Sequence, residues 1–184
     1  TPYYQSNHTI VVGGGNVAMD AARCARRLGK KVTVVYRRSL AEMPARKEEV
    51  EHAMDEDITF MTLHNPVEIN KDEKGFVKGV KLEKMELGEP DERGRRSPVP
   101  TGEMMDLVCD CVIMALGTSS NPLLVRSEPR LQTNPRGCLI VDEQQETTMK
   151  NVYAGGDAVS GAATVILALG AGKRAAASII KALT

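Results

Sequence analysis

The first part of the chain combines two apolar runs with one helical pattern. Ile10–Val12 is an apolar run that stops at three glycines, and Val32–Tyr36 is a second run. Between them an apolar stripe recurs at steps of four, three and four and predicts a helix that ends near Gly29: its members are Val17, Ala21, Cys24 and Leu28. A strand, a helix and a strand in so short a stretch predict a βαβ unit with a parallel sheet.

The pattern then changes twice. A second helix is predicted at about residues 45–54 and a third strand at residues 58–61. From residue 67 to residue 108 short alternating segments predict antiparallel strands. Within that stretch residues 88–100 are rich in charge and predict a mobile hairpin loop, for which a solvated loop is favoured over a partner site. Residues 112–117 predict another buried strand, which ends in glycine.

A boundary is predicted after Gly117, because residues 118–122 are rich in turn-forming residues and the following stretch has little periodicity. Beyond it, residues 152–154 predict a strand, and an alanine-rich helix is expected from near Ala162 to Leu183. We therefore expect an α/β fold in two domains. Residues 1–117 form a Rossmann-like domain with a parallel sheet and an antiparallel β meander, and residues 118–184 form a strand–helix piece of a second domain.

Composition and charge argue against several classes of partner. Lys and Arg together number 24, as do Asp and Glu, so no net field would attract nucleic acid or an anionic membrane. Aromatic residues make up 3% of the chain and Trp is absent, which argues against a surface that stacks on bases. No apolar stretch reaches the roughly 18 residues of a membrane helix, and no signal peptide is visible. We expect a cytoplasmic protein.

Cysteine and histidine offer no catalytic or metal-binding pattern. The cysteines form no C-x-x-C and no zinc-type spacing, so we expect four reduced packing residues, with a redox or metal role as the alternative: Cys24, Cys109, Cys111 and Cys138. The three histidines, His8, His52 and His64, are scattered along the chain. No acid or base is assigned to any residue.

The candidate chemistry begins at the first glycine cluster. The sequence Gly13-Gly14-Gly15-Asn16-Val17-Ala18 is a G-x-G-x-x-A that follows a predicted strand and opens a predicted helix. In this motif Gly13 permits the tight turn, Gly15 lets a pyrophosphate approach the backbone, and Ala18 allows close packing of the helix on the strand. The helix N-terminus then offers N–H groups and partial positive charge to the diphosphate. A glycine turn without a ligand is the alternative.

The choice of cofactor is predicted at the end of the second strand. NAD sites normally carry Asp or Glu there, to accept from the ribose 2′-hydroxyl. This chain has Arg37 and Arg38 instead, and guanidinium groups bind a 2′-phosphate through charge-assisted hydrogen bonds. NADP(H) is therefore favoured, with Arg46 as a third, weaker contributor. A solvated basic turn is the alternative.

A second glycine cluster lies near the end of the chain. Asn151-Val152-Tyr153-Ala154-Gly155-Gly156-Asp157 resembles the second flavin signature of flavoproteins with two dinucleotide-binding domains. The resemblance implies that Asp157 accepts from the ribityl chain of FAD, next to Gly156, and that the helix expected near Ala162 directs its N-terminus at the flavin ring. A simple turn is the alternative.

Taken together, the motifs resemble the glutamate synthase small (β) subunit family and related NADPH-dependent FAD oxidoreductases. Five segments across nearly the whole chain carry this resemblance: 11–20, 35–39, 42–45, 112–117 and 151–157. Glu42-Met43-Pro44-Ala45 distinguishes that family from thioredoxin reductases. The resemblance implies an NADP(H) site lined by Gly13, Gly15, Asn16, Val17, Ala18, Arg37, Arg38 and Gly117, and an FAD contact at Asp157.

Two features of that family are not found in this chain. They are an N-terminal segment with cysteine ligands for iron–sulfur clusters, and a first G-x-G-x-x-G that holds the adenosine diphosphate of FAD. We therefore expect residues 118–184 to be the C-terminal part of an FAD-binding domain and the chain to be a piece of a longer flavoprotein. That protein would pass hydride between NADP(H) and FAD and deliver electrons to another subunit or domain, whereas the isolated chain would be inactive.

Three alternative functions differ in how well the sequence supports them. A thioredoxin-reductase-like enzyme needs a C-x-x-C between the NADP strands, and a short-chain dehydrogenase needs Tyr-x-x-x-Lys, and neither is found in this sequence. A stand-alone NADP(H)-binding module without catalysis is the non-enzymatic alternative.

Overall fold

The computed structural model describes residues 6–29, 31–92 and 94–184. The chain folds into two compact units, residues 1–116 and 117–184, which are described separately below. The division falls one residue before the boundary expected from the sequence.

The first unit is built on a parallel four-stranded sheet. Its strands are β1 (His8–Val12), β2 (Lys31–Tyr36), β3 (Thr59–Thr62) and β7 (Cys111–Met114), in the order β3-β2-β1-β7. All three pairings are parallel, so the predicted βαβ unit and parallel sheet are confirmed. Helices α1 (Asn16–Arg27) and α2 (Lys47–Asp55) connect the strands, and the short 3-10 helix η1 (Leu40–Glu42) follows β2.

An antiparallel sheet forms a second layer of this unit. It contains β4 (His64–Lys71), β5 (Val77–Pro90) and β6 (Arg96–Leu107), in the order β4-β5-β6. The antiparallel strands predicted between residues 67 and 108 are therefore confirmed. The prediction of a loop over residues 88–100 was wrong, because the β5–β6 pairing continues to Pro90 opposite Arg96. Of the charged residues in this segment, Arg93 lies outside the described residues.

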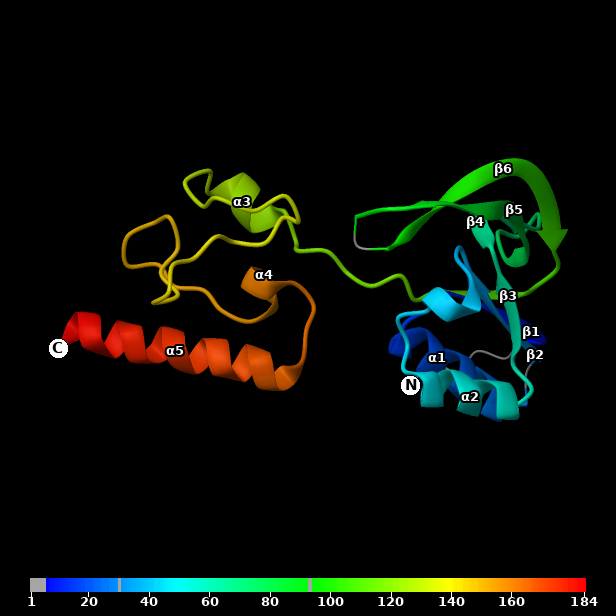
Figure 1. The fold of residues 1–184 in the computed structure, drawn as a ribbon, viewed down its shortest axis with the longest axis horizontal. Coiled ribbons are helices and arrows are strands. Elements are labelled where there is room, and N and C mark those ends of the chain that lie inside the picture. The colour runs from blue at the N-terminus through cyan, green and yellow to red at the C-terminus, as the bar shows by residue number, and fades with distance from the viewer. Residues whose placement is uncertain (1–5, 30, 93) are drawn as a thin grey trace. The chain divides into compact units, whose positions relative to one another are not determined.

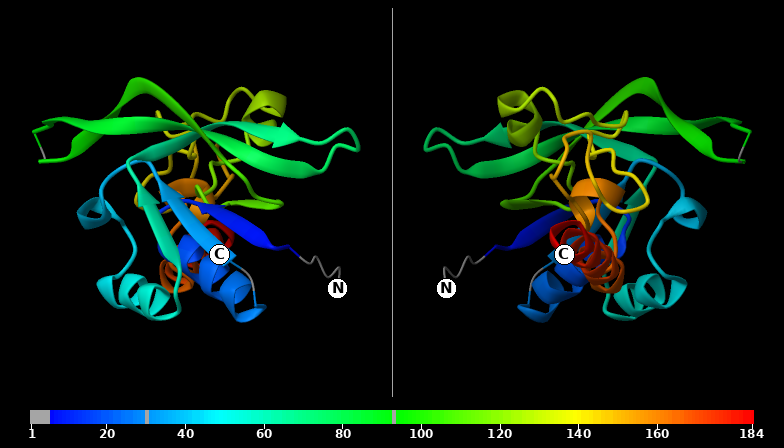
Figure 2. Two further views of the ribbon diagram at one scale, coloured as in Figure 1. Left: turned by 90° about the vertical axis from the view of Figure 1, so that its right-hand side faces the viewer. Right: turned by 90° about the vertical axis from the view of Figure 1, so that its left-hand side faces the viewer.

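Both faces of the parallel sheet are covered, as Figures 1 and 2 show: α1 and α2 lie on one face and the antiparallel sheet lies on the other. Successive strand residues point to opposite faces, so Val11, Val32 and Val34 pack with the helices. Ile10, Val12 and Val35 pack instead with Val80 and Leu82 of β5. Continuous apolar runs, rather than alternating ones, are what such a doubly covered sheet requires.

Helix α1 buries a different face from the one expected. Its buried residues are Ala18, Met19 and Ala22, whereas Val17 is 70% exposed and Leu28 is 55% exposed. The small side chains of Ala18 and Ala22 allow the helix to lie close to the strands. Because this face covers the sheet, Val17 and Leu28 of the predicted stripe turn to solvent, and Ala21 packs only partly buried against the core. Cys24, expected as a packing residue, is exposed for the same reason.

The second unit contains three helices and little strand. The helices are α3 (Leu123–Ser127), α4 (Asp157–Ser160) and α5 (Val165–Leu183). The strand predicted at residues 152–154 is only an isolated bridge from Tyr153 to Glu146. The last helix begins later than expected, because Gly161 has a φ of 79° and ends α4, and Thr164 then caps α5 by accepting from the Leu167 N–H. No helix in the described part of the chain is long and apolar enough to cross a membrane.

We predict that Leu82→Ala destabilises the first unit by about 2–5 kcal/mol, the usual cost of truncating a buried leucine. Leu82 is 0% exposed and joins the antiparallel sheet to the parallel sheet. Denaturant unfolding followed by circular dichroism measures the change. Phe76→Ala is the matched control, because Phe76 is 59% exposed and its removal is expected to cost little. Equal effects of the two substitutions would contradict the layered core.

Candidate functional site

The three glycines after β1 differ in what surrounds them. A Cβ on Gly13 would lie 2.3 Å from the carbonyl oxygen of Ala115, and a Cβ on Gly14 would lie 2.7 Å from the ring of Tyr36. Gly13 also has a φ of +144°, a conformation that favours glycine. A Cβ on Gly15 would meet nothing within 4 Å. The fold itself therefore requires Gly13 and Gly14, whereas the space beside Gly15 is open.

That open space lies at the N-terminus of α1. Gly15 is the N-cap residue, and no side chain of the described residues caps the helix there. Because Asn16 and Val17 are exposed, the first turn is accessible from solvent, whereas Ala18 is fully buried against the sheet. An uncapped helix start combines free backbone N–H groups with the positive end of the helix dipole, which suits an anion.

The two arginines after β2 lie in different surroundings. Arg37 is exposed, whereas Arg38 is half-buried. Among the described residues the Nε of Arg38 is the buried side-chain nitrogen or oxygen that has no hydrogen-bond partner. A buried, charged N–H group without a partner is unfavourable, since it has lost water and gained nothing. Arg38 therefore has an unused donor at the edge where β2 ends.

Arg46 is already engaged within the chain. Its guanidinium pairs with Glu49 at 3.1 Å, and its backbone N–H donates to Oδ1 of Asn16 at 2.9 Å. Glu49 also pairs with Arg23 at 3.0 Å. An anion near Arg46 would compete with Glu49, so the structure gives Arg46 less free charge than Arg37 or Arg38.

The ion pairs continue from Arg23 to Glu56, which joins α1 to the end of α2. Glu56 accepts from Arg23 at 2.9 Å and from Arg27 at 2.7 Å. The hydrogen bond from Arg27 is the main cause that lowers the pKa of Glu56 to about 2, against the opposing effect of burial and with further help from Arg23. This network holds α1 against α2, the helix that begins directly after Arg46.

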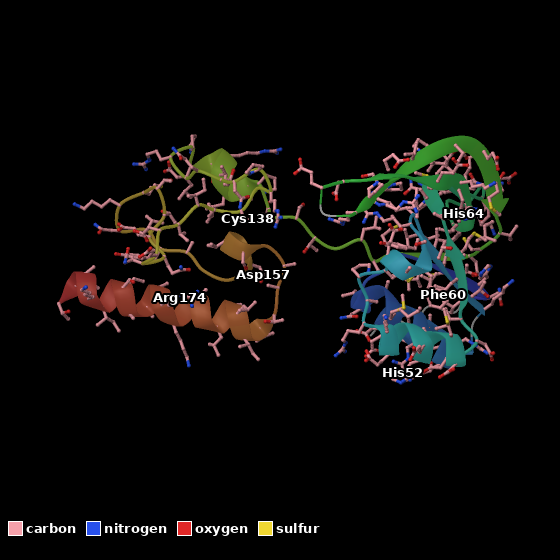
Figure 3. All side chains as sticks on the ribbon, viewed as in Figure 1. His52, Phe60, His64, Cys138, Asp157 and Arg174 are labelled. Atoms are coloured by element: carbon pink, nitrogen blue, oxygen red, sulfur yellow. The ribbon has the colours of Figure 1, made fainter. Side chains whose placement is uncertain are left out.

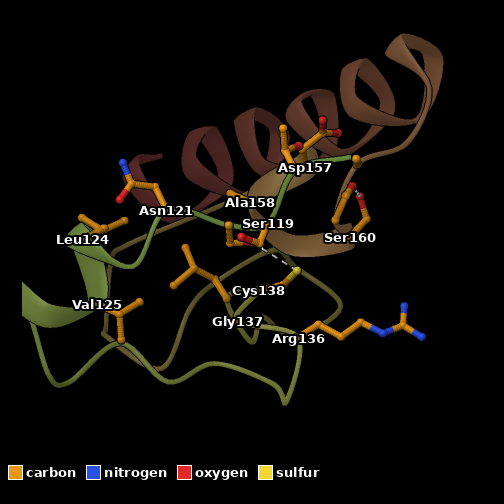
Figure 4. Close-up of a pocket in the computed structure, with 15 residues that line it drawn as sticks. Ser119, Asn121, Leu124, Val125, Arg136, Gly137, Cys138, Asp157, Ala158 and Ser160 are labelled. Carbon is orange, nitrogen blue, oxygen red and sulfur yellow. Dashed lines mark hydrogen bonds between the residues drawn. The ribbon is translucent and has the colours of Figure 1, made fainter. Parts of the chain in front are cut away.

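The second unit holds a cleft of about 590 Å³. Figure 4 shows its lining residues, among them Asp157, Cys138 and Arg136. Ser120 and the buried Cys138 are in hydrogen-bond contact there, with Oγ and Sγ 3.4 Å apart. The cleft lies wholly within residues 118–162.

Asp157 is held at this cleft by the two glycines before it. Gly156 has a φ of 68°, and a Cβ on Gly155 would lie 3.0 Å from the backbone of Ala171 in α5. The turn therefore lies directly against α5, and Asp157 begins the short helix α4 with an exposed side chain. Gly117, the remaining predicted site residue, opens the second unit with a φ of 84°.

The histidines and cysteines form no reactive cluster. His8 bonds the carbonyl of Val108 at 2.8 Å and the hydroxyl of Thr33 at 2.9 Å, while His52 and His64 lie on α2 and β4 (Figure 3). Burial is the main cause that raises the pKa of Cys109 to about 11, which keeps it a neutral thiol. Among the described residues no group of histidine, cysteine and carboxylate side chains could hold a metal ion.

Comparison with known proteins places this geometry in a family. The family described as pyridine nucleotide-disulphide oxidoreductase matches residues 2–175. The chain belongs to this family. The chain is 45% identical over 97% of its length to the β subunit of an NADP(+)-dependent formate dehydrogenase from Moorella thermoacetica. It is 34% identical over 96% of its length to the small chain of an NADPH glutamate synthase from Escherichia coli, which confirms the family resemblance predicted from the motifs.

The chain covers only part of those relatives, 25% of the formate dehydrogenase subunit and 39% of the glutamate synthase chain. Among solved structures it is similar to a thioredoxin reductase from T. acidophilum, with a TM-score of 0.77 and 25% identity over 96% of this chain and 53% of that one. The expected Rossmann-like α/β fold is thereby confirmed. The family uses NADP(H) and FAD, as the motifs predict.

We predict that Glu56→Gln lowers the stability of the first unit at neutral pH but not in strong acid. The folded-state pKa of Glu56 is depressed to about 2, so its contribution is present above the unfolded pKa and is lost as pH falls through the folded one. The difference between wild type and variant should be constant above about pH 5 and disappear toward pH 2. Denaturant midpoints across this range measure it.

Glu51→Gln is the control for that experiment. Glu51 is exposed on α2 and forms no ion pair with any described residue. Its substitution should therefore leave the loss of stability between about pH 5 and about pH 2 unchanged. A Glu56 difference that persists undiminished at low pH would rule out the ion-pair explanation.

Proposed function

We propose that the chain is the NADPH-binding portion of a flavoprotein oxidoreductase of the glutamate synthase small-subunit type. In the longer protein, hydride would pass between NADP(H) and FAD. The residues described above bind and orient these cofactors, and the cofactors themselves supply the redox chemistry.

The observation that carries the proposal is the unpartnered, buried Nε of Arg38. It lies directly after β2, where the ribose of a dinucleotide is recognised in a Rossmann fold. A 2′-phosphate supplies the oxygen acceptor that this N–H lacks, and hydrogen bonds to charged groups are worth about 1.5–3 kcal/mol. A 2′-hydroxyl offers no such charge. Arg37 adds an exposed second donor, and Arg46 a weaker third because of its pairing with Glu49.

The diphosphate is assigned to the start of α1. Gly15 leaves open the volume in which a diphosphate would approach the backbone, and nothing else in the described chain requires a glycine at that position. Gly13, Gly14, Asn16, Val17 and Ala18 shape this loop and helix start. For Gly117, the first residue of the second unit, NADP(H) binding stays a proposal that rests on the family resemblance.

The FAD assignment rests on the cleft of the second unit. The Gly155-Gly156 turn holds Asp157 at the cleft with an exposed carboxylate, which suits acceptance from ribityl hydroxyls. The remaining part of the FAD site would lie elsewhere in a longer protein, in keeping with the fraction of its relatives that this chain covers. The named relatives are a β subunit and a small chain, so we also propose an electron-accepting partner subunit or domain.

We predict that the chain prefers NADPH to NADH by about ten-fold or more, since one charge-assisted hydrogen bond corresponds to roughly that ratio. The double variant Arg37→Ala, Arg38→Ala should lose most of this preference and bind NADH almost as well as wild type does. Calorimetric titration with both nucleotides measures the ratio. Arg95→Ala is the matched control, because Arg95 is an exposed arginine on the turn between β5 and β6. Equal wild-type affinities would refute the NADP(H) assignment.

A second prediction concerns flavin. The 184-residue chain by itself should not retain FAD and should lack NADPH-dependent reductase activity, because its cleft would cover too little of the ligand. Absorption near the flavin band, before and after dialysis against added FAD, tests this. The full-length protein is the positive control. Stoichiometric FAD that survives dialysis of the isolated chain would mean that it carries a complete flavin site.

A further inference from the structure

The segment from Arg37 to Arg46 folds back over the glycine loop. At its far end, the N–H of Ala45 donates to the carbonyl of Gly14 at 3.0 Å. The next N–H, that of Arg46, donates to Oδ1 of Asn16 at 2.9 Å. The proposed 2′-phosphate segment and the proposed diphosphate loop are therefore joined directly, although about thirty residues separate Asn16 from Arg46.

Tyr36 makes a second connection between the same two elements. Its ring lies against Gly14, where an added Cβ would be only 2.7 Å from the nearest ring atoms. Its hydroxyl donates to the carbonyl of Glu42 at 3.0 Å. One side chain at the end of β2 thus touches the glycine loop with its ring and holds the returning segment with its hydroxyl.

The segment between Tyr36 and Ala45 also has hydrogen bonds of its own. Ser39 and Glu42 form a capping box, in which the Ser39 N–H donates to Oε2 of Glu42 at 3.3 Å. The Ser39 hydroxyl also donates to the same oxygen, at 3.0 Å. On the other side, the N–H of Leu63 donates to the carbonyl of Arg38 at 3.0 Å. Arg37 and Arg38 consequently stand on a backbone that is held on both sides.

Holding the backbone in this way matters for recognition. A guanidinium on a mobile segment must be ordered when its ligand binds, and this ordering reduces affinity. A guanidinium on a segment that is already fixed loses less entropy, and it is presented at a set distance from the diphosphate loop. The hydroxyl of Tyr36 and Oδ1 of Asn16 are used by the chain itself, which suits a positioning role rather than contact with the cofactor.

We propose that Tyr36 and Asn16 are positioning residues that set the preference for NADP(H), by holding the Arg37–Arg46 segment on the glycine loop. This inference rests on the proposed function. It differs from the resemblance-based assignment of Asn16, because its side chain acts on the backbone of Arg46. Ser39 and Glu42 support the same role, because their hydrogen bonds hold the segment in its folded form.

The test compares NADPH and NADH affinities of the full chain by calorimetry. Tyr36→Phe removes one hydroxyl and keeps the ring on Gly14, so it should weaken NADPH binding by about two- to ten-fold and leave NADH binding nearly unchanged. Asn16→Ala should lower the NADPH-to-NADH preference in the same way. Asn16→Asp keeps an acceptor for the Arg46 N–H, so the ratio of NADPH to NADH affinity should stay at the wild-type value. Its added negative charge should lower the affinity for both nucleotides. Tyr153→Phe, in the second unit, is the matched control.

A double-mutant cycle separates positioning from direct contact. In the Arg37→Ala, Arg38→Ala background, Tyr36→Phe should have little further effect on NADPH affinity, because only the weaker Arg46, which is paired with Glu49, is left to position. An additive effect in that background would mean that Tyr36 touches the cofactor and would overturn the inference. An unchanged preference in both Tyr36→Phe and Asn16→Ala would also overturn it.

The outcomes distinguish this inference from the proposed function. A wild-type chain that shows no preference for NADPH refutes the proposed function, and the positioning role with it. A wild-type preference that survives in Tyr36→Phe and Asn16→Ala leaves the function intact and refutes only the positioning role. Circular dichroism reports on the folding of each variant, and Asn16→Ala serves alone if Tyr36→Phe does not fold.

Discussion

The close approach of neighbouring strand ends to Gly13 and Gly14 is the constraint on which the first unit depends. Gly13 lies against the carbonyl of Ala115 after β7, and Gly14 lies against the ring of Tyr36 after β2. Any Cβ at these two positions would displace one of the neighbouring strand ends. The ends of three strands therefore meet at one loop, and this meeting point is where α1 begins and where an anion can reach its N-terminus.

The remainder of the first unit supports that meeting point from two sides. The helices bury Val11 and Val34, and the antiparallel sheet buries Ile10 and Val12, so the central strands are held rigidly between two layers. Ion pairs centred on Glu56 then join α1 to the end of α2. A rigid scaffold below the loop is what allows short polar contacts above it to position side chains accurately.

Much of the candidate site could be predicted from residue types. The glycine pattern indicated the start of α1, and the two arginines after β2 indicated a 2′-phosphate, because glycine and guanidinium have few other uses in that pattern. The linkage through Tyr36, Glu42 and Asn16 was not predicted. Glu42-Met43-Pro44-Ala45 indicated only the family, because hydrogen bonds between a side chain and a backbone group, over six residues at Tyr36 and thirty at Asn16, leave no local periodicity.

The sequence alone determined the parallel βαβ unit, the antiparallel strands and the position of both glycine clusters, because apolar runs and glycines report directly on local backbone geometry. Only the tertiary structure decided which face of α1 is buried, how far β5 and β6 remain paired, and that Arg38 keeps an unused buried donor. These three features depend on contacts with residues far away in the sequence. Helix α1 packs through Ala18, Met19 and Ala22 rather than through Val17 and Leu28, because the sheet covers that face of the helix.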